Sequence, residues 1–376
     1  MDFTFSAEQL EFRDALNALL REEVTGERIR ARWESNTGWD EGLEAQLLSM
    51  GVFSLMFPES LGGLGLGMVD SVLLAEACGR VVLPEPVVET MMIASPLLVD
   101  ILDRGLGNGS VQAIVDDLMA GKSRIAVSHP INPHLNFAAR ADWIMAGSGD
   151  GVYLLPVDAI QLTARKSVDP SRRLTEIRFD PLPEYCLAQG EVGAALLRAV
   201  LNRGGLATAA QLLGLAENLI QQSVQYAGDR TQFGRPVGAN QAVKHLLADV
   251  AVQLEYARPV IARAAYTVGF SPERADFAVS HAKLAATRVA ALAARYAIQV
   301  HGAMGYTWEC DVQIAAKRVW ALISEWGEEG FHKNRIHEWL LQPNALIGPE
   351  YTFGRRSLMI PSSDVGQCAS TARTTK

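Results

Sequence analysis

The sequence predicts a mostly helical protein that carries a small β-domain between two helical parts. The chain has 376 residues, too many for one ordinary core, and this length favours two or three domains. Apolar residues recur at helical spacing in the first third of the chain and over longer stretches after residue 191. Between these parts, from about Ser123, short strand-like runs are separated by glycine and proline.

Residues 1–122 are expected to form the N-terminal helical domain. Ser6 and Gln9 have the spacing of a capping box at the start of the first helix. The glycine-rich stretch 58–67 is predicted to be a loop. Further helices are expected at 40–50, 68–79, 87–102 and 111–120.

Residues 123–190 are expected to form the middle β-domain, with strands near 143–146, 152–156 and 174–179. Glycines and prolines separate these runs, as is typical of turns between short strands. A core built from about sixty residues is small, so this domain is expected to pack against its neighbours.

Residues 191–345 are expected to form a C-terminal four-helix bundle of long antiparallel helices, followed by an irregular tail at 346–376. Gly204 and Gly205 stand inside the first helix. Each glycine costs about 1 kcal/mol relative to alanine in a helix interior, so the pair indicates close packing or a break. The four helices are expected at 192–229, 241–270, 272–300 and 311–341.

Charge and composition exclude several classes of protein. The formal net charge of −8 argues against a general nucleic-acid binder, which needs a basic surface. No apolar run reaches the ~20 residues of a membrane span, and the N-terminus does not resemble a secretory signal. The cysteines and histidines have no metal-site spacing, so no metal and a reducing cytoplasmic location are expected. The four cysteines are Cys78, Cys186, Cys310 and Cys368.

Two stretches of the last part carry the chemistry. Residues 229–237 read DRTQFGRPV, with NQAVKHLLAD following at 240–249, and residues 299–309 read QVHGAMGYTWE. Together with the helical, β, helical order, both stretches resemble the acyl-CoA dehydrogenase family over roughly residues 1–340. Pro58-Glu59 and the glycines after it, and the stretch 76–80, add weaker matches.

The resemblance implies FAD as cofactor, an acyl-CoA substrate and an electron-transfer flavoprotein as electron acceptor. It also implies a tetramer in which this surface holds the ADP part of a FAD whose flavin ring lies in the neighbouring subunit. Arginine offers a fork of donors for phosphate, glutamine offers amide groups, and glycine allows close backbone approach. The residues that match this role are Arg230, Gln232, Phe233, Gln241, Gln299, Gly302, Ala303 and Gly305.

Each of these residues also has a simpler interpretation. Arg230 would favour the dipole at a helix end, and Phe233 would serve packing. Gln241 would lie on a solvated helix face, and Gly302 and Gly305 would be turn residues.

The catalytic residue that the resemblance requires is missing. Family members abstract a proton with a glutamate, which most of them place before a glycine after the second motif. In this chain that position is Trp326, followed by Gly327. A second group of members places the glutamate early in the long helix, which corresponds to Gly204. Glu325 is one residue from the first position, a turn of about 100° around a helix.

The β-domain differs from the family pattern as well. Members carry a Thr-Glu-Pro stretch that precedes residues bonded to the flavin ring. Here the corresponding segment, 123–130, reads SRIAVSHP, and no Gly-Ser-Asp continuation follows in 131–140. The chain therefore keeps the half of the site that serves a neighbour's FAD and lacks the half for its own flavin ring.

These features lead to one expectation and several alternatives. We expect a partner subunit of an α2β2 acyl-CoA dehydrogenase for fatty or sterol-derived acyl groups, with the base on the other chain. One alternative is a self-sufficient homotetramer that uses Glu325 after a helix bulge. The others are a structural subunit without flavin and a flavin-dependent oxidase on the same fold.

Overall fold

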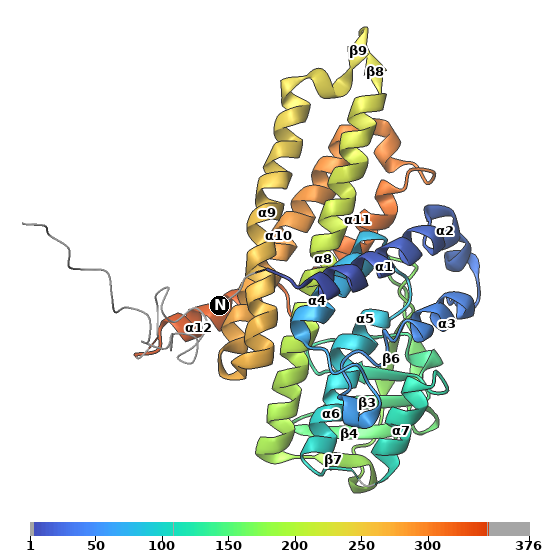
Figure 1. Ribbon diagram of the computed structural model, residues 1–376, viewed down its shortest axis with the longest axis vertical. Coiled ribbons are helices and arrows are strands. Elements are labelled where there is room, and N and C mark those ends of the chain that lie inside the picture. The colour runs from blue at the N-terminus through green and yellow to red at the C-terminus, as the bar shows by residue number, and fades with distance from the viewer. Residues whose placement is uncertain (1–3, 108, 344, 346–376) are drawn as a thin grey trace, which may run out of the picture.

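A computed structural model of the chain describes residues 4–107, 109–343 and 345. Figure 1 shows long helices that run along the molecule, with the β-strands of the middle part beside their lower half and a short hairpin at the top. The expected tail at 346–376 and Cys368 lie outside the described residues. None of the helices in the described part is long and apolar enough to cross a membrane.

The N-terminal part is a set of short helices that pack against the long ones. The capping box is confirmed, because the Gln9 N–H donates to Ser6 Oγ (3.2 Å) and the Ser6 N–H donates to Gln9 Oε1 (2.8 Å). A helix at 26–34 was not expected, and the expected helix at 87–102 contains a five-residue π-helix, Thr90–Ala94. The α-helices are α1 (Ala7–Glu23), α2 (Gly26–Glu34), α3 (Glu41–Ser49), α4 (Met68–Arg80), α5 (Val87–Glu89), α6 (Ser95–Asp103) and α7 (Gly109–Met119).

The β-strands of the middle part form two small sheets with the strand orders β1-β3-β4-β7 and β2-β6-β5, and a two-stranded sheet lies in the C-terminal part. Strand β1 pairs with β3 in parallel, and the other pairings are antiparallel. Along β4, Val152 and Leu154 join the helical core, whereas Tyr153 and Leu155 join a second core between the sheets. The strands are β1 (Ile125–Ser128), β2 (Leu135–Asn136), β3 (Trp143–Ser148), β4 (Gly151–Pro156), β5 (Gln161–Ala164), β6 (Leu174–Arg178) and β7 (Cys186–Ala188).

The C-terminal part is the expected helical bundle, in which α10 packs against α8, α9, α11 and α12. Gly204 and Gly205 lie inside the unbroken α8 and mark close packing, not a break. The expected single helix at 311–341 is wrong: Trp326 (φ 54°) and Gly327 (φ 101°) have left-handed backbones in a turn that separates two helices. The helices are α8 (Gly190–Asp229), α9 (Gln241–Phe270), α10 (Ala275–His301), α11 (Val312–Leu322) and α12 (Glu329–Leu340).

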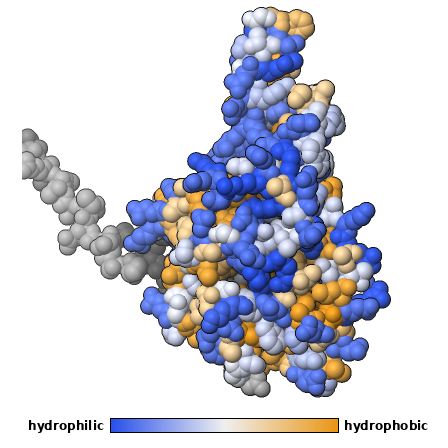
Figure 2. Space-filling model, turned by 90° about the vertical axis from the view of Figure 1, so that its right-hand side faces the viewer, coloured by the Kyte–Doolittle hydropathy of each residue, from blue (hydrophilic) through white to orange (hydrophobic). Residues whose placement is uncertain are grey.

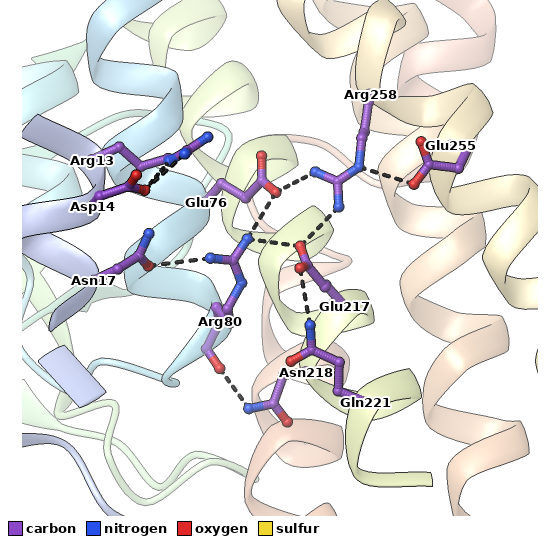
Figure 3. Close-up of polar contacts among 10 residues, drawn as sticks. All are labelled: Arg13, Asp14, Asn17, Glu76, Arg80, Glu217, Asn218, Gln221, Glu255 and Arg258. Atoms are coloured by element: carbon purple, nitrogen blue, oxygen red, sulfur yellow. Dashed lines mark hydrogen bonds and ion pairs between the residues drawn. The ribbon is translucent and has the colours of Figure 1, made fainter. Parts of the chain in front are cut away.

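A charged network joins the N-terminal helices to the bundle (Figure 3). Arg80 of α4 donates to Glu217 of α8 (2.7 Å), and Arg258 of α9 donates to both Glu76 of α4 (2.6 Å) and Glu217 (2.8 Å). Gly214 allows α8 to approach α4, because a Cβ there would lie 2.0 Å from the Glu76 carbonyl oxygen. The network therefore fixes where α4 crosses the bundle.

Candidate functional site

The first motif forms a hairpin at the far end of α8 and α9, at the top of Figure 1. Strands β8 (Thr231–Gln232) and β9 (Arg235–Pro236) pair there, and Phe233 (φ 52°) and Gly234 (φ 78°) form the two-residue turn. The Phe233 side chain is fully exposed (102%). Figure 2 shows this end as a narrow projection with apolar atoms at its tip. The ring is therefore accessible to another molecule that approaches this end of the bundle.

The polar residues of the first motif surround this turn. Arg230 caps the C-terminal end of α8, and its guanidinium makes no ion pair with any described residue. Gln232 and Gln241 are exposed as well, and the Gln232 amide donates to the Thr231 carbonyl (2.7 Å). Arg235 is occupied locally, because it donates to Asn240 Oδ1 (2.8 Å). Arg230, Gln232 and Gln241 can therefore meet a ligand that approaches from outside the chain.

The second motif lies at the C-terminal end of α10, where Gly302 (φ 59°) ends the helix. His301 is buried and stacks on Tyr226 of α8 (ring centroids 4.2 Å apart), which joins the second motif to the helix end that carries the first. Gln299, Gly302 and Ala303 are exposed at this junction.

Gly305 is buried, unlike Gly302, the exposed glycine of the same motif. A Cβ on Gly305 would lie 3.0 Å from the Ile298 carbonyl oxygen. Its small size therefore serves the packing of the motif onto α10.

A second candidate region is a cavity of about 370 Å³ between the N-terminal helices, the β-strands and the turn after α11. Its walls are mostly apolar, with several charged and amide groups among them. The lining residues that enter the argument are Glu89, Glu325 and Trp326.

Trp326 closes one end of this cavity. Its indole is buried (5% exposed) and lies against Gly204, where a Cβ would be 2.1 Å from the ring. The backbone N–H of Trp326 donates to Asn132 Oδ1 (2.9 Å), and the centroid of the His129 ring lies 5.8 Å from that of the indole. The two family base positions, 204 and 326, and the end of the altered segment 123–130 therefore meet at one place.

Both histidines around Trp326 are neutral at neutral pH. Burial lowers the pKa of His129 to about 4, and His129 Nδ1 accepts from the Ile131 N–H (3.1 Å). Burial, assisted by Lys283 and Arg335, lowers the pKa of His332 to about 3, and its Nε2 lies 3.0 Å from the Trp326 carbonyl oxygen. The His332 nitrogen therefore contacts the turn, whereas the His129 nitrogen fixes its own segment at 129–131.

Glu325 lies in the turn before Trp326, so the expected 100° rotation around a helix does not apply. Its carboxylate lines the cavity and forms an ion pair with the buried Arg172. Behind the turn, the buried Lys283 ammonium donates to the carbonyl oxygens of Leu322 (3.1 Å) and Ile323 (3.0 Å). Burial lowers the pKa of Lys283 to about 7, although Glu325 opposes this shift.

Glu89 is a cavity residue that the sequence analysis missed. It is the last residue of α5, directly before the π-helix, an element that often occurs at functional sites. Burial raises the pKa of the Glu89 carboxyl, and the nearby Glu325 raises it further. No motif marks this glutamate. Only the Pro-Glu-Pro start of its helix, at 84–86, is unusual in the sequence.

The fold and these two regions define a class of flavin-dependent dehydrogenases, and the comparisons with known proteins agree. Residues 6–103 match the acyl-CoA dehydrogenase N-terminal domain, and residues 191–341 match the acyl-CoA dehydrogenase C-terminal domain. The chain belongs to the acyl-CoA dehydrogenase family, and it is an oxidoreductase of that family with FAD as cofactor. The family resemblance and the fold class are thereby confirmed.

Individual relatives are distant but span most of the chain. Acyl-CoA dehydrogenase IpdE2 of Mycobacterium tuberculosis is 29% identical over 310 residues, which cover 81% of this chain and 89% of that protein. The ChsE4-ChsE5 complex from Mycobacterium tuberculosis has a chain of the same fold (TM-score 0.78, 22% identity, 90% of this chain and 99% of that chain). A glutaryl-coenzyme A dehydrogenase bound to glutaryl-CoA is similar too (TM-score 0.79, 20% identity, 91% and 97% covered).

The described residues fit FAD at one region and not at the other. The hairpin offers a guanidinium without an ion pair, exposed amides and an exposed aromatic ring, which suit a pyrophosphate, sugars and adenine. Near Gly204, where the family resemblance would place a base, the structure has the indole of Trp326, with the ring of His129 beside it. Only the hairpin region therefore fits the cofactor.

Proposed function

We propose that this chain is the non-catalytic partner subunit of a heterotetrameric, FAD-dependent acyl-CoA dehydrogenase. It lends FAD contacts across a subunit interface, and the other chain supplies the flavin-ring pocket and the general base. Arg230, Gln232, Phe233 and Gln241 would make the contacts of the hairpin. Gln299, Gly302, Ala303 and Gly305 would provide those of the second motif.

The contact between Trp326 and Gly204 carries this proposal. Both positions at which family members place the base are occupied by residues without a carboxylate, and the two touch each other in a buried site. A general base must lie within hydrogen-bond reach of the proton that it removes. An indole packed on a glycine cannot do this chemistry. The FAD-facing hairpin, by contrast, is fully exposed.

The proposed substrate is a bulky acyl-CoA, such as one with a steroid-derived side chain. A solved structure of the same fold is described as the Tcur3481-Tcur3483 steroid ACAD, and another as the ChsE4-ChsE5 complex, so paired chains occur on this fold. A subunit that has no flavin-ring pocket and no base of its own would leave space for a wide substrate in the active site of its partner. The electron acceptor would be an electron-transfer flavoprotein.

Glu325 favours a second candidate function, a self-sufficient homotetramer. Glu325 lines the cavity next to Trp326, where the family resemblance would place a base. Its ion pair with Arg172 holds the carboxylate in place. If Glu325 is the base, a Glu325→Gln variant would keep FAD and lose reduction of the flavin by substrate.

Expression of the chain alone, and with a second acyl-CoA dehydrogenase chain encoded beside it, distinguishes these functions. FAD is measured by absorbance and assembly by mass. We expect no FAD on the chain alone and about one FAD for every two protomers in a mixed tetramer. One FAD per protomer in an active homotetramer would overturn the proposal in favour of Glu325. A colourless mixed tetramer would indicate a structural subunit instead.

A further inference from the structure

Helix α2 presents one face to the loop that contains most of the second motif. Gly26, Arg30 and Trp33 stand at intervals of four and three residues, so they lie on the same side of the helix. All three lie against the loop 302–311, which joins α10 to α11. A helix of the N-terminal part therefore contacts a segment that would serve the cofactor.

Arg30 makes three hydrogen bonds to the end of this loop. Its Nε donates to the Trp308 carbonyl oxygen (3.2 Å), and its Nη2 donates to the Glu309 carbonyl oxygen (3.0 Å) and to Asp311 Oδ1 (2.6 Å). The two carbonyl contacts fix the path of the backbone itself. A guanidinium suits this task because its donors form a rigid planar fork.

Asp311 serves Arg30 and does not cap its own helix. It occupies the N-cap position of α11, where an aspartate usually accepts from a backbone N–H, but its side chain makes no such hydrogen bond. Its carboxylate instead lies beside the start of α2, where a Cβ on Gly26 would be 2.4 Å from Oδ1. The N-terminal end of a helix favours a negative charge there. The pair of Arg30 and Asp311 therefore joins α2 to the beginning of α11.

Aromatic contacts hold the same end of the loop. The Trp308 and Trp33 rings meet edge to face, with centroids 5.3 Å apart, and the Lys317 ammonium lies 4.8 Å and 5.0 Å from these centroids. At the other end, the buried Gly305 packs on α10, and the buried His301 stacks on α8. The loop is therefore held by α8 and α10 at one end and by α2 at the other.

We propose that Arg30 is a positioning residue for FAD, which holds the loop 302–311 so that Gly302 and Ala303 keep the place where they would meet the cofactor. Arg30 belongs to neither motif and would act through the backbone at 308–309. A loop that is ordered in advance binds a ligand more tightly, because less conformational entropy is lost on binding. The inference rests on the proposed function, since it requires FAD to meet the second motif.

Equilibrium titration of the mixed apo-tetramer with FAD tests the effect on affinity. Arg30→Met is expected to raise the dissociation constant about 5- to 20-fold, because FAD must then order the loop. Arg30→Lys keeps the charge but not the fork, so it should recover part of the lost affinity. Asp311→Ala leaves both carbonyl contacts and should cost about two- to threefold. Arg28→Met is the matched control, because Arg28 is an exposed arginine of the same helix whose ion pair is with Glu23.

Hydrogen exchange of the apo-tetramer separates the loop from the rest of the molecule. The amides of 303–311 should exchange at least about tenfold faster in Arg30→Met, whereas those of the hairpin 231–236 should not change. If the unmodified tetramer binds FAD, then unchanged exchange or unchanged FAD affinity in Arg30→Met, or an equal loss of affinity in Arg28→Met, would overturn this inference alone. An unmodified tetramer that takes up no FAD would overturn the proposed function and this inference with it.

Discussion

The indole of Trp326 lies directly against the α-carbon of Gly204, so closely that one added methyl group would overlap the ring. Trp326 stands in the turn between α11 and α12, and Gly204 stands inside α8. A left-handed backbone is rare for a tryptophan, and a glycine is unfavourable inside a helix, but each of the two residues explains the other. The glycine leaves room for the ring, and the ring fills the space beside the glycine.

Gly204→Ala should therefore destabilise the protein. Overpacking of a tight core costs about 1–3 kcal/mol, and urea unfolding would measure this loss. Gly228→Ala is the control, because Gly228 lies in the same helix with open space around it, and this change should be neutral or stabilising by up to about 1 kcal/mol. In a Trp326→Ala background the cost of Gly204→Ala should disappear. A cost that persists there would contradict the contact.

Arg230→Ala should weaken FAD binding in the mixed tetramer without affecting the stability of the chain. Loss of a hydrogen bond to a charged phosphate costs about 1.5–3 kcal/mol, a roughly 10- to 100-fold rise in the dissociation constant. Equilibrium titration of the apo-tetramer with FAD would measure it. Arg104→Ala, an exposed arginine of the N-terminal part, controls for the lost charge. Equal FAD affinity in both variants would remove Arg230 from the cofactor site.

Lys283 predicts a pH dependence of stability. Burial lowers its pKa to about 7 in the folded chain, so between pH 7 and about 10.4 the unfolded chain binds one proton more. Stability relative to a Lys283→Met variant should rise with pH in this window, by at most about 1.4 kcal/mol per pH unit. Below pH 7 the difference should be constant. Urea unfolding at pH 7, 8 and 9 tests this prediction. As a control, a Lys333→Met variant, changed at an exposed lysine, should differ in stability from the unmodified chain by the same amount at each pH.

Glu217→Gln should weaken the charged network between α4 and the helical bundle in Figure 3 and so lower the free energy of unfolding. Burial opposes ionisation of Glu217, but hydrogen bonds from Arg258 and Arg80 outweigh it and lower its pKa. The expected loss is about 1–3 kcal/mol at pH 7, because two arginines lose a charged partner. This contribution is present above about pH 4.3 and disappears as the pH falls through the folded-state pKa.

The exposed Glu255 provides the control for this prediction, since it pairs with the same Arg258. Glu255→Gln should change stability by less than about 0.5 kcal/mol. If the two variants unfold alike in urea, the network does not fix α4 to the bundle.

Local patterns predicted much of the fold because their causes are local. The bounds of α9 agree with the expected 241–270, and the capping box at Ser6 begins α1 as predicted. The helix α2 was missed because its nine residues carry few apolar side chains. The break at 323–328 was missed because a left-handed backbone at a tryptophan has no sequence signature; the surrounding contacts hold it there.

The candidate site likewise has a part that the sequence indicates and a part that only the structure reveals. The sequence by itself determined the family and the cofactor, because contiguous motifs such as 229–237 carry them, and the residues that would face FAD stay a prediction from the same motifs. The tertiary structure alone decided that Gly204, Trp326 and His129 meet, and that Glu89 lines the same cavity as Glu325. The physical reason is that such contacts depend on how helices and sheets pack at ångström precision, which residue spacing along the chain does not encode.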